Sequence, residues 1–524
     1  MTTAINANFG RLRSVIWPIH RSEFKKFFPM LLIYALIVFN YSLLKAAKDA
    51  LLITAPESGA ATIPYIKLWV ILPMAFLSTL IFTRLSNRYT REKVFYIMMC
   101  AFLIFFVLFI TVLYPLQSYL HPQKLANQLQ SMIPSGLQGF IAIFRNWTFT
   151  LFYVMSELWG TLIMTVLFWG FANEVTDVKE AKRFYSILGV GANIATIFAG
   201  QIGMFISSKT FYSKFALSND RWGQSLVVIC TLIIVSGVAT VIIYRHLTHN
   251  VFKKEIVDSK PLQDDKSLDL KMGMRKNFAY LSKSKYLICI ALIVVTYNIA
   301  LNMVEVVWKH QIHVVYPYAA DYNMYMGKVL TYIGVVSTLF ALFICGQTIR
   351  RFGWSVSAYV TPVILLVTGI LFFAFLLFRN VGFVGTMAGL MGATPIILSA
   401  HFGSLQNCLS RASKFTFFDV TKEIAFIPLN KESKLKGKAA IDGVGSRLGK
   451  SGGSLIHQLL LLAFGTISAS APYVAILFTT VIAVWILSVK SLGVQFDAIT
   501  SGAKPQAPTP VKGADAETPT FAHV

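Results

Sequence analysis

Residues 27–52 read FFPMLLIYALIVFNYSLLKAAKDALL. Residues 27–44 of this stretch are uncharged, and about 18 such residues suffice for a helix to cross a hydrocarbon core of roughly 30 Å. Lys45 and Lys48 then follow three positions apart, which places them on one face of the helix. An ionisable side chain is costly inside a bilayer and faces a pathway or a partner there. The stretch therefore predicts a membrane-spanning helix with a charged, functional face.

Apolar runs of this kind recur along the whole chain of 524 residues, which is 56% hydrophobic and only 13% charged. Soluble proteins average about 25% charged residues. Because backbone groups in lipid must be satisfied inside their own helix, we expect an all-α integral membrane protein. The twelve expected spans are residues 27–52, 64–84, 94–115, 141–172, 183–206, 223–245, 286–310, 327–349, 355–378, 381–409, 438–467 and 470–492.

Lysine and arginine gather in alternate loops. The loop after the second expected span holds Arg84, Arg88 and Arg91, whereas residues 54–63 hold no Lys or Arg. Cytoplasmic loops are enriched in these residues, so we expect both termini in the cytoplasm. The same rule accounts for most of the net charge of +24, with attraction of anions as a second effect. Nucleic acid is not an expected partner.

The longest polar connection, residues 246–285, is basic and divides the spans into two groups of six. This layout predicts two six-helix bundles, residues 27–245 and 286–492, with a binding site between them near the middle of the membrane. The remaining expected segments are a cytoplasmic N-terminal segment 1–26, an interfacial amphipathic segment 411–437 and a disordered cytoplasmic tail 493–524.

Three further charges interrupt apolar runs: Lys67, Glu157 and Glu305. A carboxyl group in hydrocarbon without a partner would be protonated. Each glutamate is therefore a salt-bridge partner, a proton site or a substrate contact. Two structural alternatives stay open, because Lys67 near a helix end can extend to the interface and a buried ion pair can be purely structural.

Residues 443–453 read GVGSRLGKSGG, which resembles a phosphate-binding loop, but Gly445 precedes Gly449 by four positions whereas that motif needs five. We expect instead that the glycines open space between helices, while Arg447 and Lys450 point into the cavity as partners for phosphate. Glycine-mediated helix packing alone remains the alternative.

The five cysteines are scattered without a CxxC pair, so neither a disulfide framework nor a zinc site is expected. His310 and His313 lie near Glu305 but have no third ligand in an obvious motif. We therefore expect no metal, no cofactor and no enzymatic activity. The first residues lack the apolar core of a cleaved signal peptide.

The chain resembles the ATP/ADP translocases of obligate intracellular bacteria and plastids. The resemblance rests on residues 48–53 (KDALLI), 63–69 (IPYIKLW), 156–160 (SELWG), 168–173 (FWGFAN), 304–309 (VEVVWK), 419–428 (DVTKEIAFIP), 436–442 (KGKAAID) and 449–453 (GKSGG). It implies a fold similar to the major facilitator superfamily and functional charges at Lys67, Glu157, Glu305 and Lys450. Lys438 and Arg447 are alternatives to Lys450. Lys48 and Asn302 complete the predicted substrate-binding set.

The sequence thus predicts a transporter that exchanges ATP for ADP by alternating access and imports ATP. The alternative is a proton-coupled nucleotide importer of broader specificity. Further expectations are a monomer in the bacterial inner membrane, in contact with lipid. Base preference, accompanying phosphate and the direction in the cell stay open.

Overall fold

The computed structural model of the chain describes residues 19–215, 220–251, 284–429, 437, 441 and 445–500. Every regular element in these ranges is helical. This agrees with the expectation from backbone hydrogen bonding in lipid.

The first group of helices runs from residue 24 to residue 251. Several of its spans combine α-helical segments with wider π-helical turns, labelled η. Its long elements are α2 (Phe24–Ile53), α3 (Thr62–Tyr65) with η1 (Ile66–Ile71) and α4 (Leu72–Arg88), α5 (Arg91–Leu108) with η2 (Phe109–Leu113), α9 (Trp147–Leu158) with η4 (Trp159–Phe168) and α10 (Trp169–Val175), α11 (Val178–Ile206), and α13 (Arg221–His246) with η5 (Leu247–Val251).

The second group runs from residue 285 to residue 500. Its elements are α16 (Lys285–Val315), α17 (Ala319–Leu339) with η6 (Phe340–Ile344), α18 (Cys345–Leu377), α19 (Gly382–Leu390), α20 (Pro395–Ser413) with η7 (Lys414–Phe418) and α21 (Asp419–Ala425), α23 (Ser446–Phe464) and α24 (Ile467–Thr500).

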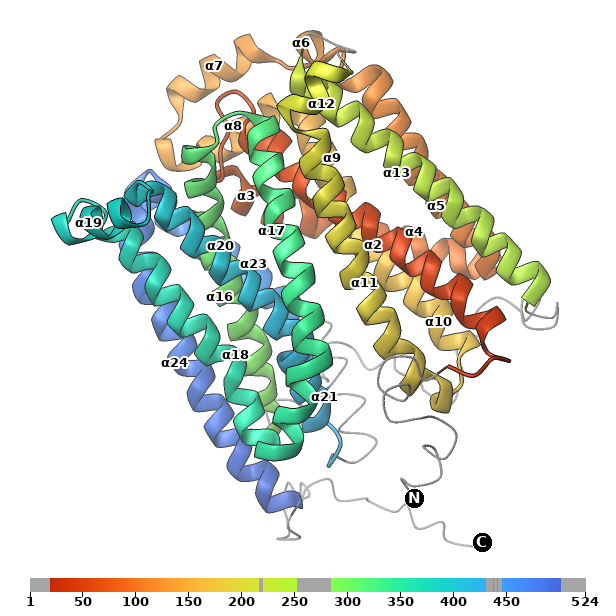
Figure 1. Ribbon diagram of the computed structural model, residues 1–524. Coiled ribbons are helices and arrows are strands. Elements are labelled where there is room, and N and C mark those ends of the chain that lie inside the picture. The colour runs from red at the N-terminus through yellow and green to blue at the C-terminus, as the bar shows by residue number, and fades with distance from the viewer. Residues whose placement is uncertain are drawn as a thin grey trace, which may run out of the picture.

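Short helices cover one end of the first group. They are α6 (Gln117–Leu120), α7 (Gln123–Met132), η3 (Ser135–Leu137), α8 (Gln138–Arg145) and α12 (Lys209–Lys214). Figure 1 shows the two groups coming together toward this end and diverging toward the end where α10 and α21 lie. We call the first of these the closed end. There Asn323 of α17 donates a hydrogen bond to Ser207, which follows α11, over 2.9 Å.

Each group has its own apolar core. One cluster of buried residues runs from Ile19 to Leu247, and a second lies mainly between Tyr286 and Leu492. The second cluster also includes Ala46, Ala50 and Tyr65 of the first group. The closed end of α2 and the start of α3 therefore pack into the other half.

Nine helices of the described part are long and apolar enough to cross a membrane, or ten if the bent pair of α19 and α20–α21 is one span. The eighth and ninth expected spans lie in one helical run, Ala319–Leu377, which bends at Gly353. Gly353 has a φ of 77°, which residues other than glycine rarely adopt. The total of twelve spans stays a prediction.

Other helix boundaries differ from the expected ones. The fourth span begins at Trp147 rather than near residue 141, because α8 is a separate helix. The last helix continues to Thr500, eight residues beyond the expected end at 492. The expected interfacial segment 411–437 starts as a direct continuation of α20 through η7 and α21. Most of the linker and tail, residues 252–283 and 501–524, lies outside the described residues.

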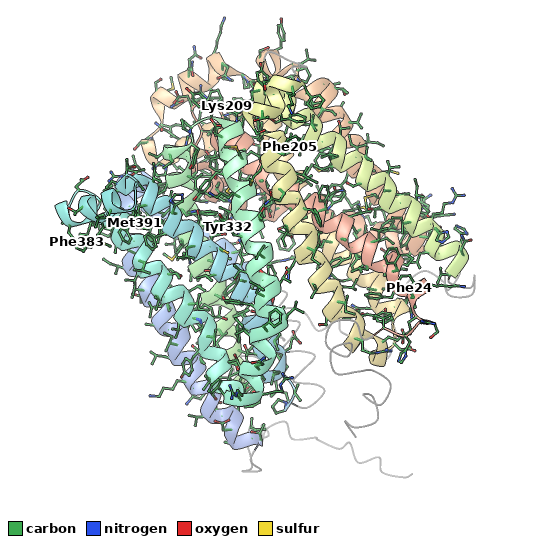
Figure 2. All side chains as sticks on the ribbon, viewed as in Figure 1. Phe24, Phe205, Lys209, Tyr332, Phe383 and Met391 are labelled. Atoms are coloured by element: carbon green, nitrogen blue, oxygen red, sulfur yellow. The ribbon has the colours of Figure 1, made fainter. Side chains whose placement is uncertain are left out.

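Large apolar side chains remain exposed around the outside of the bundles. Phe205, Tyr332, Phe383 and Met391 each expose more than half of their surface, and Figure 2 shows them projecting from the helices. Extended apolar exposure of this kind is rare on soluble proteins. It fits helices whose outer faces contact lipid.

Candidate functional site

Two long helices, one from each half, bring opposite charges together between the halves. Lys48 and Asp49 lie on α2, while Glu305 and Lys309 are one turn apart on α16. Lys309 Nζ lies 2.8 Å from Asp49 Oδ2 and 3.1 Å from Glu305 Oε1. The pair of Asp49 and Lys309 therefore joins the two halves through a buried ion pair.

Lys67 makes a second connection between the halves. It lies in the π-helical segment η1, and Pro73 follows shortly after it. Proline has no N–H to donate, so the regular pattern of hydrogen bonds is interrupted here. Lys67 Nζ lies 3.3 Å from Glu305 Oε2 and donates a hydrogen bond to Asn302 Oδ1 over 2.8 Å. Wide helical turns of this type occur frequently at functional sites.

Glu305 is shared by cations from three different segments. Besides Lys67 and Lys309, the guanidinium of Arg411 on α20 lies 3.1 Å from Glu305 Oε1. Arg411 also donates from Nε to Asn407 Oδ1, one turn earlier on α20, over 2.9 Å. Three cations from separate segments thus converge on a single carboxylate.

Glu157 of α9 contacts the other end of the network. Its Oε1 lies 2.9 Å from Lys48 Nζ, which in turn lies 3.1 Å from Asp49 Oδ1. Lys48 Nζ also sits 3.6 Å from the centre of the Tyr153 ring, a favourable position for a cation. Asp49 thus connects the Lys48–Glu157 pair to Lys309 and Glu305.

Glycines bring α23 close to α16. A Cβ at Gly449 would lie 2.8 Å from the carbonyl oxygen of Val295, and one at Gly453 would lie 3.0 Å from Asn302 Cβ. The close approach lets Asn302 donate to the carbonyl oxygen of Lys450 over 2.8 Å. Glycine-mediated packing and the position of Lys450 beside the site therefore occur together.

Two cations lie beside the network without an ion pair among the described residues. The charge of Lys45 on α2 interacts with those of Arg411 and Glu305. The exposed Lys450 interacts electrostatically with Glu157, Lys67 and Glu305. Unpaired cations in this position are available to an anionic ligand.

The cluster carries an excess of positive charge. Among the described residues it holds three carboxylates, Asp49, Glu157 and Glu305, against six cations: Lys45, Lys48, Lys67, Lys309, Arg411 and Lys450. Basic side chains therefore outnumber the carboxylates by three. Solvent reaches part of the cluster, because 31% of the Glu157 side chain and 22% of the Lys67 side chain are exposed.

The structure brings together most of the predicted site residues. Lys67, Glu305 and Asn302 are in direct contact, Lys48 pairs with Glu157, and Lys450 joins through its backbone. Arg447 lies apart on an exposed face of α23, with its guanidinium 5.5 Å from the Phe76 ring of α4. Lys438 lies outside the described residues.

Three members of the network were not predicted: Asp49, Lys309 and Arg411. Asp49 is the neighbour of Lys48 in the sequence, and Lys309 follows Glu305 by four residues, which is one helical turn. Because opposite charges at this spacing lie side by side on a helix, the sequence could have identified Lys309. Arg411 lies two residues beyond the tenth expected span, in the segment expected to be interfacial. The helix that carries it begins at Pro395, later than expected, so that Arg411 still lies inside it.

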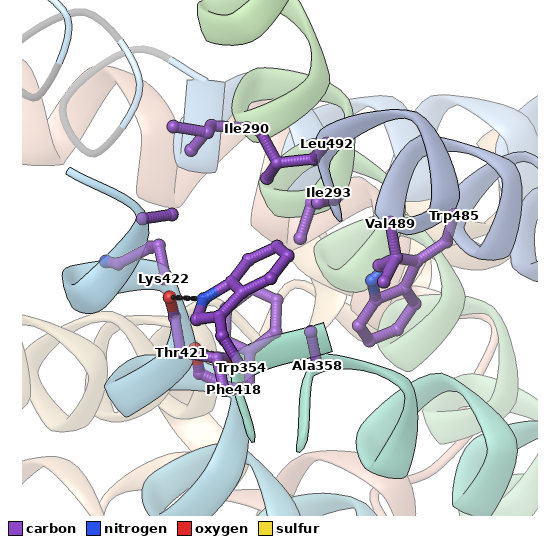
Figure 3. A pocket seen from close by; sticks show the side chains of 11 residues that line it. Ile290, Ile293, Trp354, Ala358, Phe418, Thr421, Lys422, Trp485, Val489 and Leu492 are labelled. Atoms are coloured by element: carbon purple, nitrogen blue, oxygen red, sulfur yellow. Dashed lines mark hydrogen bonds between the residues drawn. The ribbon is translucent and has the colours of Figure 1, made fainter. Parts of the chain in front are cut away.

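A separate small pocket lies within the second half, between α16, α18, α21 and α24 (Figure 3). Its lining is mainly apolar, with Trp354 donating from its ring N–H to the carbonyl oxygen of Thr421 over 2.8 Å. Lys422 is the charged residue of this lining. The pocket does not offer the convergent cations found between the halves.

Comparison with solved structures shows that two membrane transporters share the overall fold of this chain. A bacterial homologue of the iron transporter ferroportin, in an inward-facing state, matches with a TM-score of 0.54 at 15% identity, covering 89% of this chain and all of that one. The D-xylose-proton symporter matches with a TM-score of 0.51 at 13% identity, covering 90% of this chain and 97% of that one.

Comparison with the sequences of known proteins identifies the family of this chain. ADP,ATP carrier protein 1 of Chlamydia pneumoniae is 44% identical over 498 residues, which cover 95% of this chain and 96% of that protein. The chloroplastic ADP,ATP carrier protein 1 of Arabidopsis thaliana is 38% identical over 494 residues, covering 93% of this chain and 76% of that protein. Residues 2–496 match the family described as TLC ATP/ADP transporter. The chain belongs to this family of membrane transporters.

Proposed function

We propose that this protein exchanges ATP for ADP across a membrane by alternating access. The observation that carries the proposal is the cluster of charged groups shared by the two halves, in which basic side chains outnumber carboxylates by three. ATP carries about four negative charges near neutral pH and ADP about three, mainly on their phosphates. The cluster is complementary to such ligands in the sign of its charge.

In this proposal Lys67 and Lys450 neutralise the phosphates, together with Lys48. Lys67 and Lys450 are reachable by solvent, and ammonium groups are common phosphate partners. A phosphate that approaches Lys48 competes with Glu157, whose carboxylate then becomes free to accept a hydrogen bond from the ribose. Asn302 orients Lys67, and Arg447 supplies an additional positive charge one turn before Lys450, at the start of α23.

Substrate binding also weakens the connection between the halves, because phosphate replaces Glu305 as a partner of Lys67. A ligand shifts a conformational equilibrium only through different interactions with the two states. Alternating access follows because the two halves can separate at the closed end once substrate occupies the site. We further propose that the closed end faces the outside of the cell, because residues 54–63 at that end contain no Lys or Arg.

The proposal includes a monomeric carrier in the bacterial inner membrane with both termini in the cytoplasm. The enriched Lys and Arg in alternate loops support the orientation. A complete cluster formed by the two halves of one chain supports the monomer. Import of ATP against export of ADP is the proposed direction.

The test uses purified protein reconstituted in liposomes and labelled ATP outside. We expect uptake with ADP or ATP inside and none into empty vesicles. Uptake into empty vesicles that rises with an inward proton gradient would support a proton-coupled importer instead. Absence of any nucleotide uptake would overturn the proposal.

The same vesicles show whether phosphate accompanies ADP. Exchange of ATP for ADP alone moves one net charge, so an imposed membrane potential would change its rate. Outward movement of phosphate together with ADP would compensate this charge. Labelled phosphate placed inside with ADP measures the second possibility directly.

A further inference from the structure

The pair formed by Asp49 and Lys309 is more deeply buried than the pairs that involve Lys67 or Glu157, and it is matched in burial by the adjacent pair of Lys48 and Asp49, whose side chains are 3% and 0% exposed. Only 2% of the Lys309 side chain and none of the Asp49 side chain is exposed, against 22% for Lys67 and 31% for Glu157. The ring hydroxyls of Tyr153 and Tyr322 are buried nearby, and both side chains interact electrostatically with Asp49. A nucleotide that enters from solvent therefore meets Lys67 and Glu157 before this pair.

Asp49 and Lys309 also lie toward the closed end relative to Lys45 and Glu305. On α2, Asp49 is one turn farther along the helix than Lys45, and on α16 Lys309 is one turn beyond Glu305. The halves cannot separate at the closed end unless this pair separates. In an empty carrier, separation of Asp49 from Lys309 would leave two desolvated charges without their partners, which is unfavourable.

Glu305 connects the buried pair to the accessible part of the site. Its Oε2 faces Lys67, while its Oε1 faces Lys309 and Arg411. When phosphate takes Lys67, Glu305 loses one cation and interacts more strongly with Lys309. Asp49 then keeps Lys48, 3.1 Å away, as its partner. Substrate binding thereby lowers the cost of separating Asp49 from Lys309 without touching either group.

We propose that the Asp49–Lys309 ion pair is the element that makes transport by this chain an obligate exchange, because it holds the empty carrier closed. The inference rests on the proposed nucleotide exchange and assigns positioning roles to two residues that do not contact substrate. Their removal should affect coupling rather than recognition. The distinguishing quantity is the ratio of nucleotide efflux without an exchange partner to efflux with one.

Asp49→Asn is the main variant. It removes the connection between the halves, while Lys309 keeps Glu305 at 3.1 Å and Lys48 keeps Glu157 at 2.9 Å, so neither lysine loses its last carboxylate. Vesicles in which the closed end faces the lumen are loaded with labelled ADP and diluted into medium with or without ATP, so that efflux without ATP requires the empty carrier to open at its closed end. We expect the ratio of unpaired to paired efflux to rise about tenfold or more over the unmodified protein. The half-saturating ATP concentration should change little.

The matched control is Arg221→Gln/Asp321→Asn. This pair also joins the two halves, over 2.9 Å, but its side chains are 20% and 25% exposed, so solvent compensates when it separates. Its efflux ratio should stay that of the unmodified protein. The double variant Asp49→Asn/Lys309→Gln, which leaves no charge at either position, should leak as Asp49→Asn does and serves if the single variant does not fold.

The possible results of these experiments distinguish the role of the Asp49–Lys309 pair from the proposed nucleotide exchange. A folded Asp49→Asn protein that exchanges nucleotides with an unchanged efflux ratio overturns the inference and leaves nucleotide exchange intact. An equal rise in the control variant overturns it as well, because any pair between the halves would then suffice. Absence of nucleotide transport by the unmodified protein contradicts the proposed function itself.

Discussion

At the scale of single residues, the site is built from carboxylates that each serve several cations. Glu305 contacts Lys67, Lys309 and Arg411, and Asp49 contacts Lys48 and Lys309. Breaking one such pair by removing a partner typically costs about 3–5 kcal/mol when both charges are buried. When an anionic substrate binds one of the cations, the carboxylate that this cation contacted still has a second cationic partner.

Lys450 and Arg447, three positions apart on α23, give a direct comparison. Lys450 interacts with the charges of Glu157, Lys67 and Glu305, whereas Arg447 packs beside the Phe76 ring. We expect Lys450→Gln to raise the half-saturating ATP concentration about tenfold, since a charged hydrogen bond contributes about 1.5–3 kcal/mol. Arg447→Gln should raise it less than about threefold by the same measure. Concentration-dependent ATP uptake in vesicles measures both, and a larger effect at Arg447 would reverse the assignment.

Sequence reasoning found the charges that stand alone in apolar runs, namely Lys48, Lys67, Glu157 and Glu305. It did not find Arg411, because a charge near the expected end of a span at residue 409 is also typical of a cytoplasmic loop. The missing information was the position of the helix. Thr394 caps α20 by accepting a hydrogen bond from the backbone N–H of Ile397, and Pro395 occupies the first turn, so the helix is displaced toward the C-terminus.

At the scale of elements, α11 and α17 close the gap between the halves through glycines. A Cβ at Gly200 would approach the carbonyl oxygen of Gly327 to 2.5 Å, and one at Gly327 would approach that of Gly200 to 2.7 Å. Backbones this close leave no room for a side chain. Small residues at a helix crossing are the usual means of close packing within membranes.

Gly200→Ala should therefore push α11 and α17 apart and destabilise the protein by about 1–3 kcal/mol, the usual cost of overpacking. Gly189→Ala on the same helix is the matched control, because a Cβ there meets no atom within 4 Å. It should leave the melting temperature unchanged or slightly raised, since alanine favours helix more than glycine does. Thermal unfolding in detergent compares the two, and equal melting temperatures would contradict the packing described here.

Helix breaks were harder to predict than helices. The expected loop between the eighth and ninth spans, residues 350–354, is helical apart from a bend at Gly353. The tenth expected span is instead a bent pair, with α19 and α20–α21 at 75° to each other. Apolar periodicity shows that a segment is a helix, but a bend depends on a single glycine or proline and on what packs beside it.

At the scale of the whole molecule, two halves with separate cores meet through a small number of polar contacts. The basic segment at residues 246–285 predicts the division into halves, and this division stays a prediction. The sequence could not predict which end is closed. That depends on contacts between segments far apart in sequence, such as Ser207 with Asn323.

A cross-link at the closed end should stop transport. In the variant Ser207→Cys/Asn323→Cys, oxidation joins two positions whose native side chains lie 2.9 Å apart. We expect exchange to fall to about a tenth or less, because separation of this end limits every cycle. A reducing agent should restore it. The single-cysteine variants are the controls, and full exchange by the cross-linked protein would exclude alternating access through this end.

The central claim is that one charged site between the halves carries ATP in one direction and ADP in the other. The most direct measurement counts labelled ADP leaving vesicles for each labelled ATP that enters, with both nucleotides followed in the same sample. The account predicts one ADP out for one ATP in at every ATP concentration. Entry of ATP without a corresponding loss of ADP would contradict it.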